Sequence, residues 1–296
     1  MAGIKELRLR ITSVGNIKQI TRAMEMVATT KLRRFQDRAL ASRPYAQEIE
    51  GLVGRLAGML GDDLGERPLF QARKQGKTLA LVVSSDRGLC GPYNTNLFRA
   101  LETWRADRPE VDGGGVDYFV YGRKAHTYMS KRDFSVRRFL TDPTLEDTDY
   151  RNAAITARML TKEFLSGDYS EVWVLYSAFQ SMSRYVPTWA QFLPIEASAL
   201  TQGQAGEADP GGDILLEPDA GTVFDELVPR YLETRIYNAL LESLTSEYAS
   251  RRFAMKNATD AANDMQSELR SIYNRKRQET ITKELLDIVG GAEAVS

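Results

Sequence analysis

The feature that most constrains the fold is a pair of long amphipathic segments, one near each end of the chain. The first runs over about residues 3–60 and the second over about residues 219–289. Helices of about 55 to 70 residues would be on the order of 80 to 105 Å long, far beyond the diameter of a small domain. We therefore expect both helices to leave any globular part of the chain.

Apolar side chains recur along each segment in steps of three and four residues, the spacing of one face of a helix. The stripe predicted for the first segment consists of Ile4, Leu7, Ile11, Val14, Ile17, Ile20, Met24, Val27, Leu32, Phe35 and Ala39. The stripe predicted for the second consists of Leu240, Leu244, Ala254, Ala258, Ala261, Met265 and Ile272, interrupted by Glu247 and Arg251. Each stripe needs a partner, so the pattern predicts an antiparallel coiled coil. A large helical bundle is the alternative, and the length of the segments argues against it.

The middle of the chain alternates predicted strands and helices. KTLALVVSSD at 77–86 indicates a buried strand, as parallel sheets contain, and a tight loop at 87–92 leads into a helix. The other predicted elements are a strand at 116–121, helices at 93–104, 123–131 and 149–165, a strand at 171–177, an edge strand at 185–195 and a loop at 198–213. This order predicts a small doubly wound, Rossmann-like α/β domain. We expect residues 1–75 and 216–296 to form the coiled coil and residues 76–215 the globular domain.

Composition excludes several classes of function. The chain has one cysteine, Cys90, and one histidine, His126, too few for an intramolecular disulfide or a typical zinc site. Its longest apolar run, at 78–83, is far too short to span a membrane. The charged N-terminus does not resemble a signal peptide, so we expect action in the compartment of synthesis or as a mature organellar product.

Positive charge is concentrated in the first helix. Residues 1–60 contain eleven Lys and Arg against five Asp and Glu, an excess of six positive charges, although the whole chain has a net charge of −1. This excess indicates either an acidic partner or a solvated helix face. Nucleic acid would satisfy it, but the chain contains no recognisable nucleic-acid module, so we predict no nucleic-acid binding.

The loop SSDRGLCG follows the first predicted strand, where α/β enzymes bind phosphates. Its glycines do not have the G-x-G-x-x-G spacing, and Pro92 and Tyr93 stand where a P-loop needs Lys and Ser or Thr. Cys90 would be a nucleophile only beside a base, and His126 lies beyond the next strand. We predict no catalytic residue, no cofactor and no metal, with the glycines permitting the turn and Cys90 packing as a small apolar residue.

Three motifs carry a family resemblance. They are RITSVGNIKQITRAMEMVATTKLRRFQ near the start, SSDRGLCGPYNTN in the middle and YNRKRQETITKELLDIVGGAEAV at the end. Together they resemble the gamma subunit of F-type ATP synthases, and the likeness extends over nearly the whole chain. The resemblance implies a non-catalytic rotor shaft, present in one copy, that transmits rotation of the membrane c-ring to the alpha and beta subunits, with the epsilon subunit on the globular foot. It also implies a peripheral position on the cytoplasmic face of the bacterial inner membrane, or the organellar equivalent.

The resemblance further implies which residues contact the beta subunit. They are Met24, Lys31, Arg33, Arg34, Arg251, Gln278, Thr282 and Glu284. Arg252 stands where the family usually has methionine, and the absence of a second cysteine excludes the redox switch of plastid forms. A nucleotide-binding enzyme that uses SSDRGLCG, and a static coiled-coil scaffold that does not turn, are the alternatives to the rotary shaft.

Overall fold

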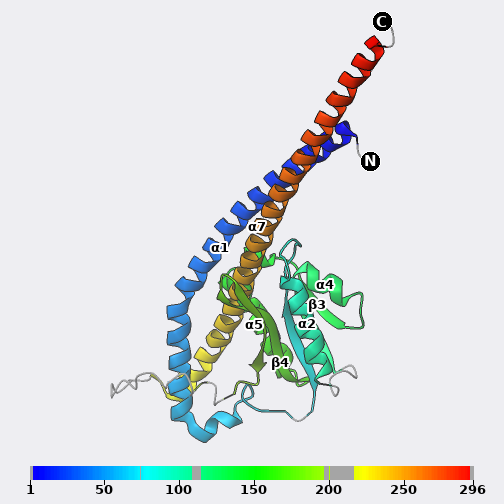
Figure 1. Ribbon diagram of the computed structural model, residues 1–296. Helices are drawn as coiled ribbons and strands as arrows, with labels where there is room; N and C mark the ends of the chain where they lie inside the picture. Colours follow the sequence, from blue (N-terminus) through cyan, green and yellow to red (C-terminus); the bar gives the residue numbers. More distant parts are fainter. Residues whose placement is uncertain (1–2, 74, 109–114, 197–199, 201–216, 294–296) are drawn as a thin grey trace. The chain divides into compact units, whose positions relative to one another are not determined.

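The computed structural model describes residues 3–73, 75–108, 115–196, 200 and 217–293 (Figure 1). The chain divides into two compact units, which we call unit 1 (Met1–Thr30 and Arg251–Ser296) and unit 2 (Lys31–Ser250). Two long helices, α1 (Ile4–Leu60) and α7 (Ala220–Glu293), contribute to both units. They contain 57 and 74 residues, so the predicted long terminal helices are confirmed. None of the described helices combines the length and the apolar composition needed to cross a membrane.

Within unit 2, α1 and α7 run antiparallel. The ring of Phe35 lies 5.4 Å from that of Tyr248, and Ser42 Oγ donates a hydrogen bond to Asn238 Oδ1 over 3.3 Å. Residue numbers therefore rise along one helix as they fall along the other. Both helices continue through a proline in this unit, Pro44 in α1 and Pro229 in α7, so neither proline marks the end of a helix.

Within unit 1 the two helices are also antiparallel, but the seam differs from the predicted one. Thr259 Oγ1 donates to Thr21 Oγ1 over 2.8 Å. In the part of α1 that belongs to unit 1 the buried residues Leu7, Val14 and Ala28 lie on a seven-residue repeat, the period of a coiled coil, with Thr21 at the intervening position. Ile17, Ile20 and Val27, which the sequence placed in the stripe, are exposed.

The predicted stripe of α7 is also wrong in its C-terminal half, where the buried positions differ from the predicted ones. Met265 is 53% exposed, while Met255, Thr259 and Ala262 are buried. Glu247 and Arg251, predicted to interrupt the stripe, are themselves buried. The observed seam therefore contains small and polar side chains, and several large apolar ones face outward.

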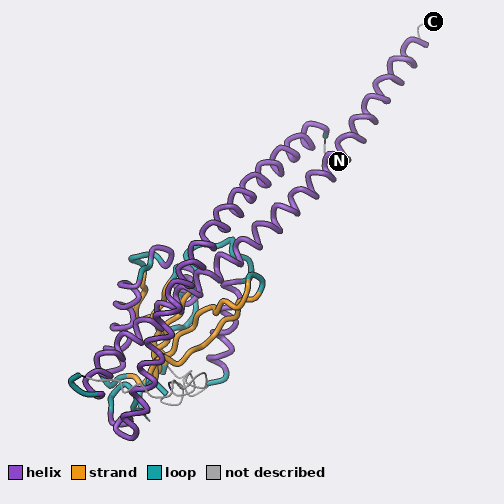
Figure 2. The backbone as a smooth tube through the Cα atoms, turned by 90° about the vertical axis from the view of Figure 1, so that its left-hand side faces the viewer, coloured by secondary structure: helices purple, strands orange, loops and turns teal. Residues whose placement is uncertain are grey.

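Unit 2 contains a five-stranded sheet of order β3-β2-β1-β4-β5. The strands are β1 (Lys77–Val83), β2 (Val116–Tyr121), β3 (Ser135–Leu140), β4 (Tyr169–Ser181) and β5 (Arg184–Leu193). The first four are parallel, and β5 pairs with β4 in the antiparallel sense at the edge. Figure 2 shows the strands in orange among the helices. The predicted edge strand is confirmed, and its Pro187 is tolerated there because an edge strand has one unpaired side.

Helices cover both faces of this sheet, as the doubly wound prediction requires. They are α2 (Tyr93–Ala106), α4 (Arg123–Met129) and α5 (Tyr150–Leu165), with short 3-10 helices η1 (Gly61–Glu66) and η2 (Leu145–Asp147) between elements. Leu97 of α2 and Met129 of α4 pack on one face, against Ala80 and Val82. On the other face Arg138 of β3 contacts Met159 of α5, and α7 packs over β4 and β5. The α/β fold class with long terminal helices is therefore confirmed.

Strand β3 was not predicted from the sequence. Its sequence SVRRFL has two consecutive arginines and alternates poorly, because the strand is half-exposed at the second edge of the sheet. Arg138 lies over the ring of Phe119, so its stem covers apolar surface. The predicted loop at 198–213 lies outside the described residues, apart from Leu200, which is buried.

Candidate functional site

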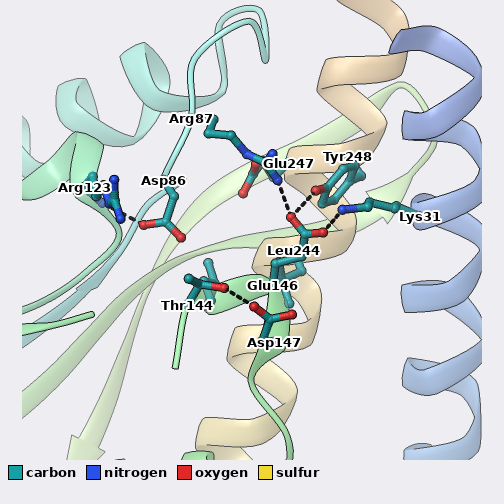
Figure 3. Close-up of a pocket in the computed structure, with 11 residues that line it drawn as sticks. Lys31, Asp86, Arg87, Arg123, Thr144, Glu146, Asp147, Leu244, Glu247 and Tyr248 are labelled. Atoms are coloured by element: carbon teal, nitrogen blue, oxygen red, sulfur yellow. Dashed lines mark hydrogen bonds and ion pairs between the residues drawn. The ribbon is translucent and has the colours of Figure 1, made fainter. Parts of the chain in front are cut away.

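A cavity of about 410 Å³ lies in unit 2 at the carboxyl ends of β1, β2 and β3 (Figure 3). The segments that follow these strands supply most of its lining, and α1 and α7 supply the rest. The lining residues are Lys31, Asp86, Arg87, Arg123, Thr144, Leu145, Glu146, Asp147, Leu244, Glu247 and Tyr248. In parallel α/β sheets ligands bind at this edge, next to the strand where the order reverses, which here is β1. The cavity is therefore the place to look for a bound nucleotide or a reaction.

The glycine beside the cavity is explained by packing and not by a ligand. Gly122, between β2 and α4, has φ +95°, and a Cβ added there would lie 2.1 Å from the carbonyl oxygen of Ser84. Ser84 itself is fully buried, and its Oγ accepts a hydrogen bond from the amide of Ala125 over 2.8 Å. The chain after β2 thus approaches the end of β1 too closely for any side chain.

Cys90 takes part in a hydrogen-bonded turn. It is 2% exposed, its Sγ accepts from Asn94 Nδ2 over 3.2 Å, and it lies 3.7 Å from Ser85 Oγ. Neither an amide nor a hydroxyl is a base that would generate a thiolate. The ring of His126 stacks on Phe139 with 4.0 Å between centroids. These contacts support the structural interpretation of the SSDRGLCG loop.

Several charged groups of the cavity are bound by other groups of unit 2. Glu146 forms ion pairs with Lys31 and Arg87, and its Oε2 accepts from the hydroxyl of Tyr248 over 2.7 Å. Asp86 accepts from the amide of Arg123 over 3.1 Å, as Figure 3 shows. Among the described residues no group of three or more His, Cys, Asp or Glu could hold a metal ion. The geometry thus favours a junction between segments over a ligand site.

Tyr121, the last residue of β2, contacts the segment that carries Glu146. Burial, the largest cause, raises the pKa of its phenol above the ordinary value of 10.0. The hydroxyl therefore remains protonated at neutral pH, and it lies 3.2 Å from Thr148 Oγ1. The segment that carries Glu146 is in this way attached to the end of the sheet.

The structure places the predicted partner residues in different surroundings. Arg33 and Arg34 are exposed on α1 in unit 2, whereas Lys31 beside them is paired with Glu146. In unit 1 Met24 is half-buried, and Arg251 is only 7% exposed. Gln278, Thr282 and Glu284 are exposed on the last part of α7. Their contacts with a partner stay a prediction.

Sequence reasoning missed two kinds of residue. Glu146 and Tyr248 were not singled out, because the first lies in a connecting segment and their contact joins residues 102 positions apart. It also placed four outward-facing residues of unit 1 in the predicted stripes, namely Ile17, Ile20, Val27 and Met265. Twelve of the nineteen large apolar side chains found exposed in the described part of the chain lie in unit 1: Leu9, Ile17, Ile20, Met26, Val27, Phe253, Met265, Ile281, Leu285, Leu286, Ile288 and Val289.

Comparison with known proteins agrees with this architecture. The sequence profile of the ATP synthase family described as "ATP synthase" matches residues 3–295. The ATP synthase gamma chain of Geotalea daltonii is 36% identical over 295 residues, covering 100% of this chain and 99% of the relative. The ATP synthase gamma chain of Acidiphilium cryptum is 39% identical over 300 residues, covering 100% of both.

Solved structures show the same fold at lower sequence identity. A chain of the Euglena gracilis mitochondrial ATP synthase, from a structure of OSCP, F1 and c-ring, has a TM-score of 0.65 at 21% identity, covering 99% of this chain and 94% of its own. A chain of the Tetrahymena thermophila central stalk and c-ring has a TM-score of 0.60 at 23% identity, covering 81% and 99%. From the profile match and the full-length relatives, we conclude that this chain belongs to the ATP synthase gamma chain family.

Proposed function

We propose that the chain is the central rotor shaft of an F1Fo ATP synthase. In this role it transmits rotation of a membrane c-ring, driven by ion flow, to a hexamer of alpha and beta subunits, and so couples ion transport to ATP synthesis or hydrolysis. The observation that carries the proposal, beyond family membership, is the set of exposed large apolar residues concentrated in unit 1.

Those exposed residues require an environment other than water. Large apolar side chains that gather on one part of a surface mark a place where another protein binds. Ile281, Leu285, Leu286, Ile288 and Val289 occupy the last described turns of α7, and all are about half or more exposed. A surrounding collar of alpha and beta subunits would cover them while leaving the helix pair free to turn.

A single shaft can hold three identical catalytic subunits in different states only if it contacts each of them differently. A conformational equilibrium shifts by the difference in interaction free energy between its states and by nothing else. One asymmetric pair of helices inside a ring of three beta subunits presents a different face to each of them. This argument supports one copy of the chain per complex, with the catalytic sites on beta and none on this chain.

The exposed members of the predicted partner set are the best candidates for those contacts. Arg33 and Arg34 on α1, and Gln278, Thr282 and Glu284 on α7, are open to a beta subunit. Met24, Lys31 and Arg251 belong to the same proposal, but the half-buried Met24 and the buried Arg251 have less surface to offer. The positive charge of the first helix favours an acidic surface on beta.

We place the contacts with the membrane sector at the other end of unit 2. A second cavity, of about 750 Å³, is lined by residues of the segment that follows α1 and of the start of α7, among them Phe70, Phe224 and Val228. About 30 residues of α1, or roughly 45 Å of helix, separate Lys31 from the start of that segment. The c-ring and the epsilon subunit are the proposed partners here. The complex would lie on the cytoplasmic face of a bacterial inner membrane, or its organellar equivalent.

The division of labour within the chain follows from these assignments. Residues 76–215 would form the foot, and residues 1–75 and 216–296 the shaft. Unit 2 also contains parts of both long helices, so the foot is joined to the shaft by side-chain packing as well as by the chain itself. That packing matters because torque would be transmitted through it from the foot to the shaft.

Rotation distinguishes a shaft from a static scaffold, and a reversible lock tests it. Cys90 is replaced by alanine, Thr282 by cysteine, and a cysteine is introduced in the facing beta subunit of a reconstituted complex. We expect oxidation to stop ATP hydrolysis and reduction to restore it. Complexes with only one of the two cysteines are the control. Hydrolysis coupled to ion transport that continues at full rate in the oxidised, crosslinked complex would show that rotation of this chain is not required.

A further inference from the structure

One carboxylate connects three separate segments of unit 2. Glu146 forms an ion pair with Lys31 of α1 and lies 2.5 Å from Nη2 of Arg87, in the segment after β1. It also accepts a hydrogen bond from Tyr248 of α7 over 2.7 Å. Figure 3 shows the three donors converging on this side chain. Glu146 is 19% exposed, so the contacts are partly shielded from water.

The segment that carries Glu146 is itself fixed to the sheet and to α1. Leu145 is buried, and Thr144 Oγ1 donates to Asp147 Oδ2 over 2.7 Å within the turn. Thr148 Oγ1 lies 3.2 Å from the hydroxyl of Tyr121, and the carbonyl oxygen of Thr148 accepts from Arg38 Nη2 of α1 over 3.0 Å. Glu146 is therefore held on a short turn that is bonded both to the end of the sheet and to α1.

The position of these contacts along the two helices is informative. Lys31 is the first residue of unit 2 on α1, and Tyr248 lies two residues before Ser250, the last of unit 2 on α7. The ring of Tyr248 also packs against Phe35 and lies 5.7 Å from Lys31 Nζ. Glu146 thus reaches both helices at the level where they pass from unit 2 into unit 1.

We infer that Glu146 is a torsional tie, a positioning residue that fixes the helix pair of unit 2 against the α/β domain where both helices leave it. The inference rests on the proposed rotor function, because only a shaft under torque requires such resistance. The charge is essential to it. A glutamine at this position would keep a hydrogen bond from Tyr248 but would lose the ion pairs with Lys31 and Arg87.

The first experiment measures the tie in the full chain without any partner. Cys90 is replaced by alanine, and nitroxide labels are attached to cysteines at the exposed positions Asp37 on α1 and Lys131 after α4, both in unit 2. Pulsed electron paramagnetic resonance then gives the distribution of label distances. We expect Glu146→Gln to widen this distribution about twofold. Asp147→Asn, in the same turn but bonded to Thr144, is the matched control and should leave the width unchanged.

Two further variants separate the tie from a general loss of structure. Lys31→Gln should also widen the distribution, and the double variant should be no wider than Glu146→Gln alone, because Glu146→Gln already removes the ion pair with Lys31. Circular dichroism verifies that each variant retains its helices. An unchanged width in folded Glu146→Gln, or an equal widening in Asp147→Asn, would overturn the inference.

The second experiment measures the consequence in the reconstituted complex. A probe attached to the α/β domain reports angular fluctuations while the alpha and beta subunits are immobilised and no nucleotide turns over. Glu146→Gln should increase the variance of the angle about twofold relative to Asp147→Asn. An unchanged variance would refute a torsional role. If Glu146→Gln widens the label distances but the parent chain does not support rotation in the complex, the role of Glu146 as a tie stands and the proposed function is refuted.

Discussion

The outward-facing apolar residues near the end of α7 give a quantitative prediction. Leu286 and Ile288 are 66% and 68% exposed. Fully burying such a side chain is worth about 1.5–3 kcal/mol, so the two thirds still open to solvent correspond to about 1–2 kcal/mol each. If a collar of alpha and beta subunits covers both, the double variant Leu286→Gln/Ile288→Gln should weaken assembly by about 2–4 kcal/mol. That is a loss of roughly 30- to 700-fold in the association constant.

The same substitutions should leave the isolated chain almost unchanged. Exposed positions away from caps and networks usually alter the free energy of unfolding by less than about 0.5 kcal/mol. The matched control is Leu40→Gln, which changes an exposed leucine of α1 in unit 2, 56% accessible, outside the region assigned to the collar. It should affect neither stability nor assembly.

Titration of labelled chain with alpha and beta subunits measures the association constant, and urea unfolding of the chain alone measures its stability. A double variant that assembles as tightly as the parent, with both glutamines present and the chain folded, would refute burial of this surface in a collar. A large loss of stability in the isolated variant would show instead that these residues are packed within the chain.

Three other substitutions test the fold of unit 2. Burial alone would raise the pKa of Asp117, but hydrogen bonds, led by the one from Ser135, lower it below 3.8. The ionised carboxylate therefore stabilises the fold at a pH above the unfolded pKa of about 3.9. This contribution is lost as the pH falls through the lowered pKa of the folded state. Asp117→Asn should therefore flatten the acid dependence of urea unfolding, and an unaltered profile would contradict this. Gly122→Ala should cost at least about 2 kcal/mol in urea unfolding, because its Cβ would meet Ser84; a cost below about 0.5 kcal/mol would contradict it. Phe35→Ala, at a fully buried position, should cost about 3–5 kcal/mol in the same assay, and a neutral result would show that this packing is dispensable.

Strand β1 shows how burial makes an element predictable from the sequence. Strand β1 is buried over all but its first residue, and its continuous apolar run made it visible in the sequence. Strand β3 was invisible because its two arginines obscure the alternation, and Arg138 contributes to packing through its stem. A local sequence pattern predicts an element when the side chains of that element reflect how deeply it is buried.

The junction at Glu146 could not have been predicted in this way. Glu146 is 102 positions from Tyr248 and more than a hundred positions from Lys31 in sequence, and their meeting depends on how α1 and α7 pack against the sheet. No spacing rule relates a glutamate in a connecting turn to a lysine on a distant helix. The family resemblance assigned Lys31 to a partner, whereas the fold shows an intramolecular carboxylate already bound to it.

The error in the helix stripes has a physical cause that bears on function. A sequence shows which residues are apolar but not whether the same chain or another one covers them. In unit 1 small or polar residues occupy the seam, including Thr21, Ala28 and Ala262, and a Cβ added to Gly15 would lie 3.0 Å from Gln266 Nε2. Small seam residues let the two backbones approach closely and leave larger apolar residues such as Ile17 on the outside. A narrow helix pair with an apolar exterior suits a shaft that enters a protein collar, so outward-facing residues that were wrongly placed in the stripes, such as Ile17, belong to the surface that a partner would cover.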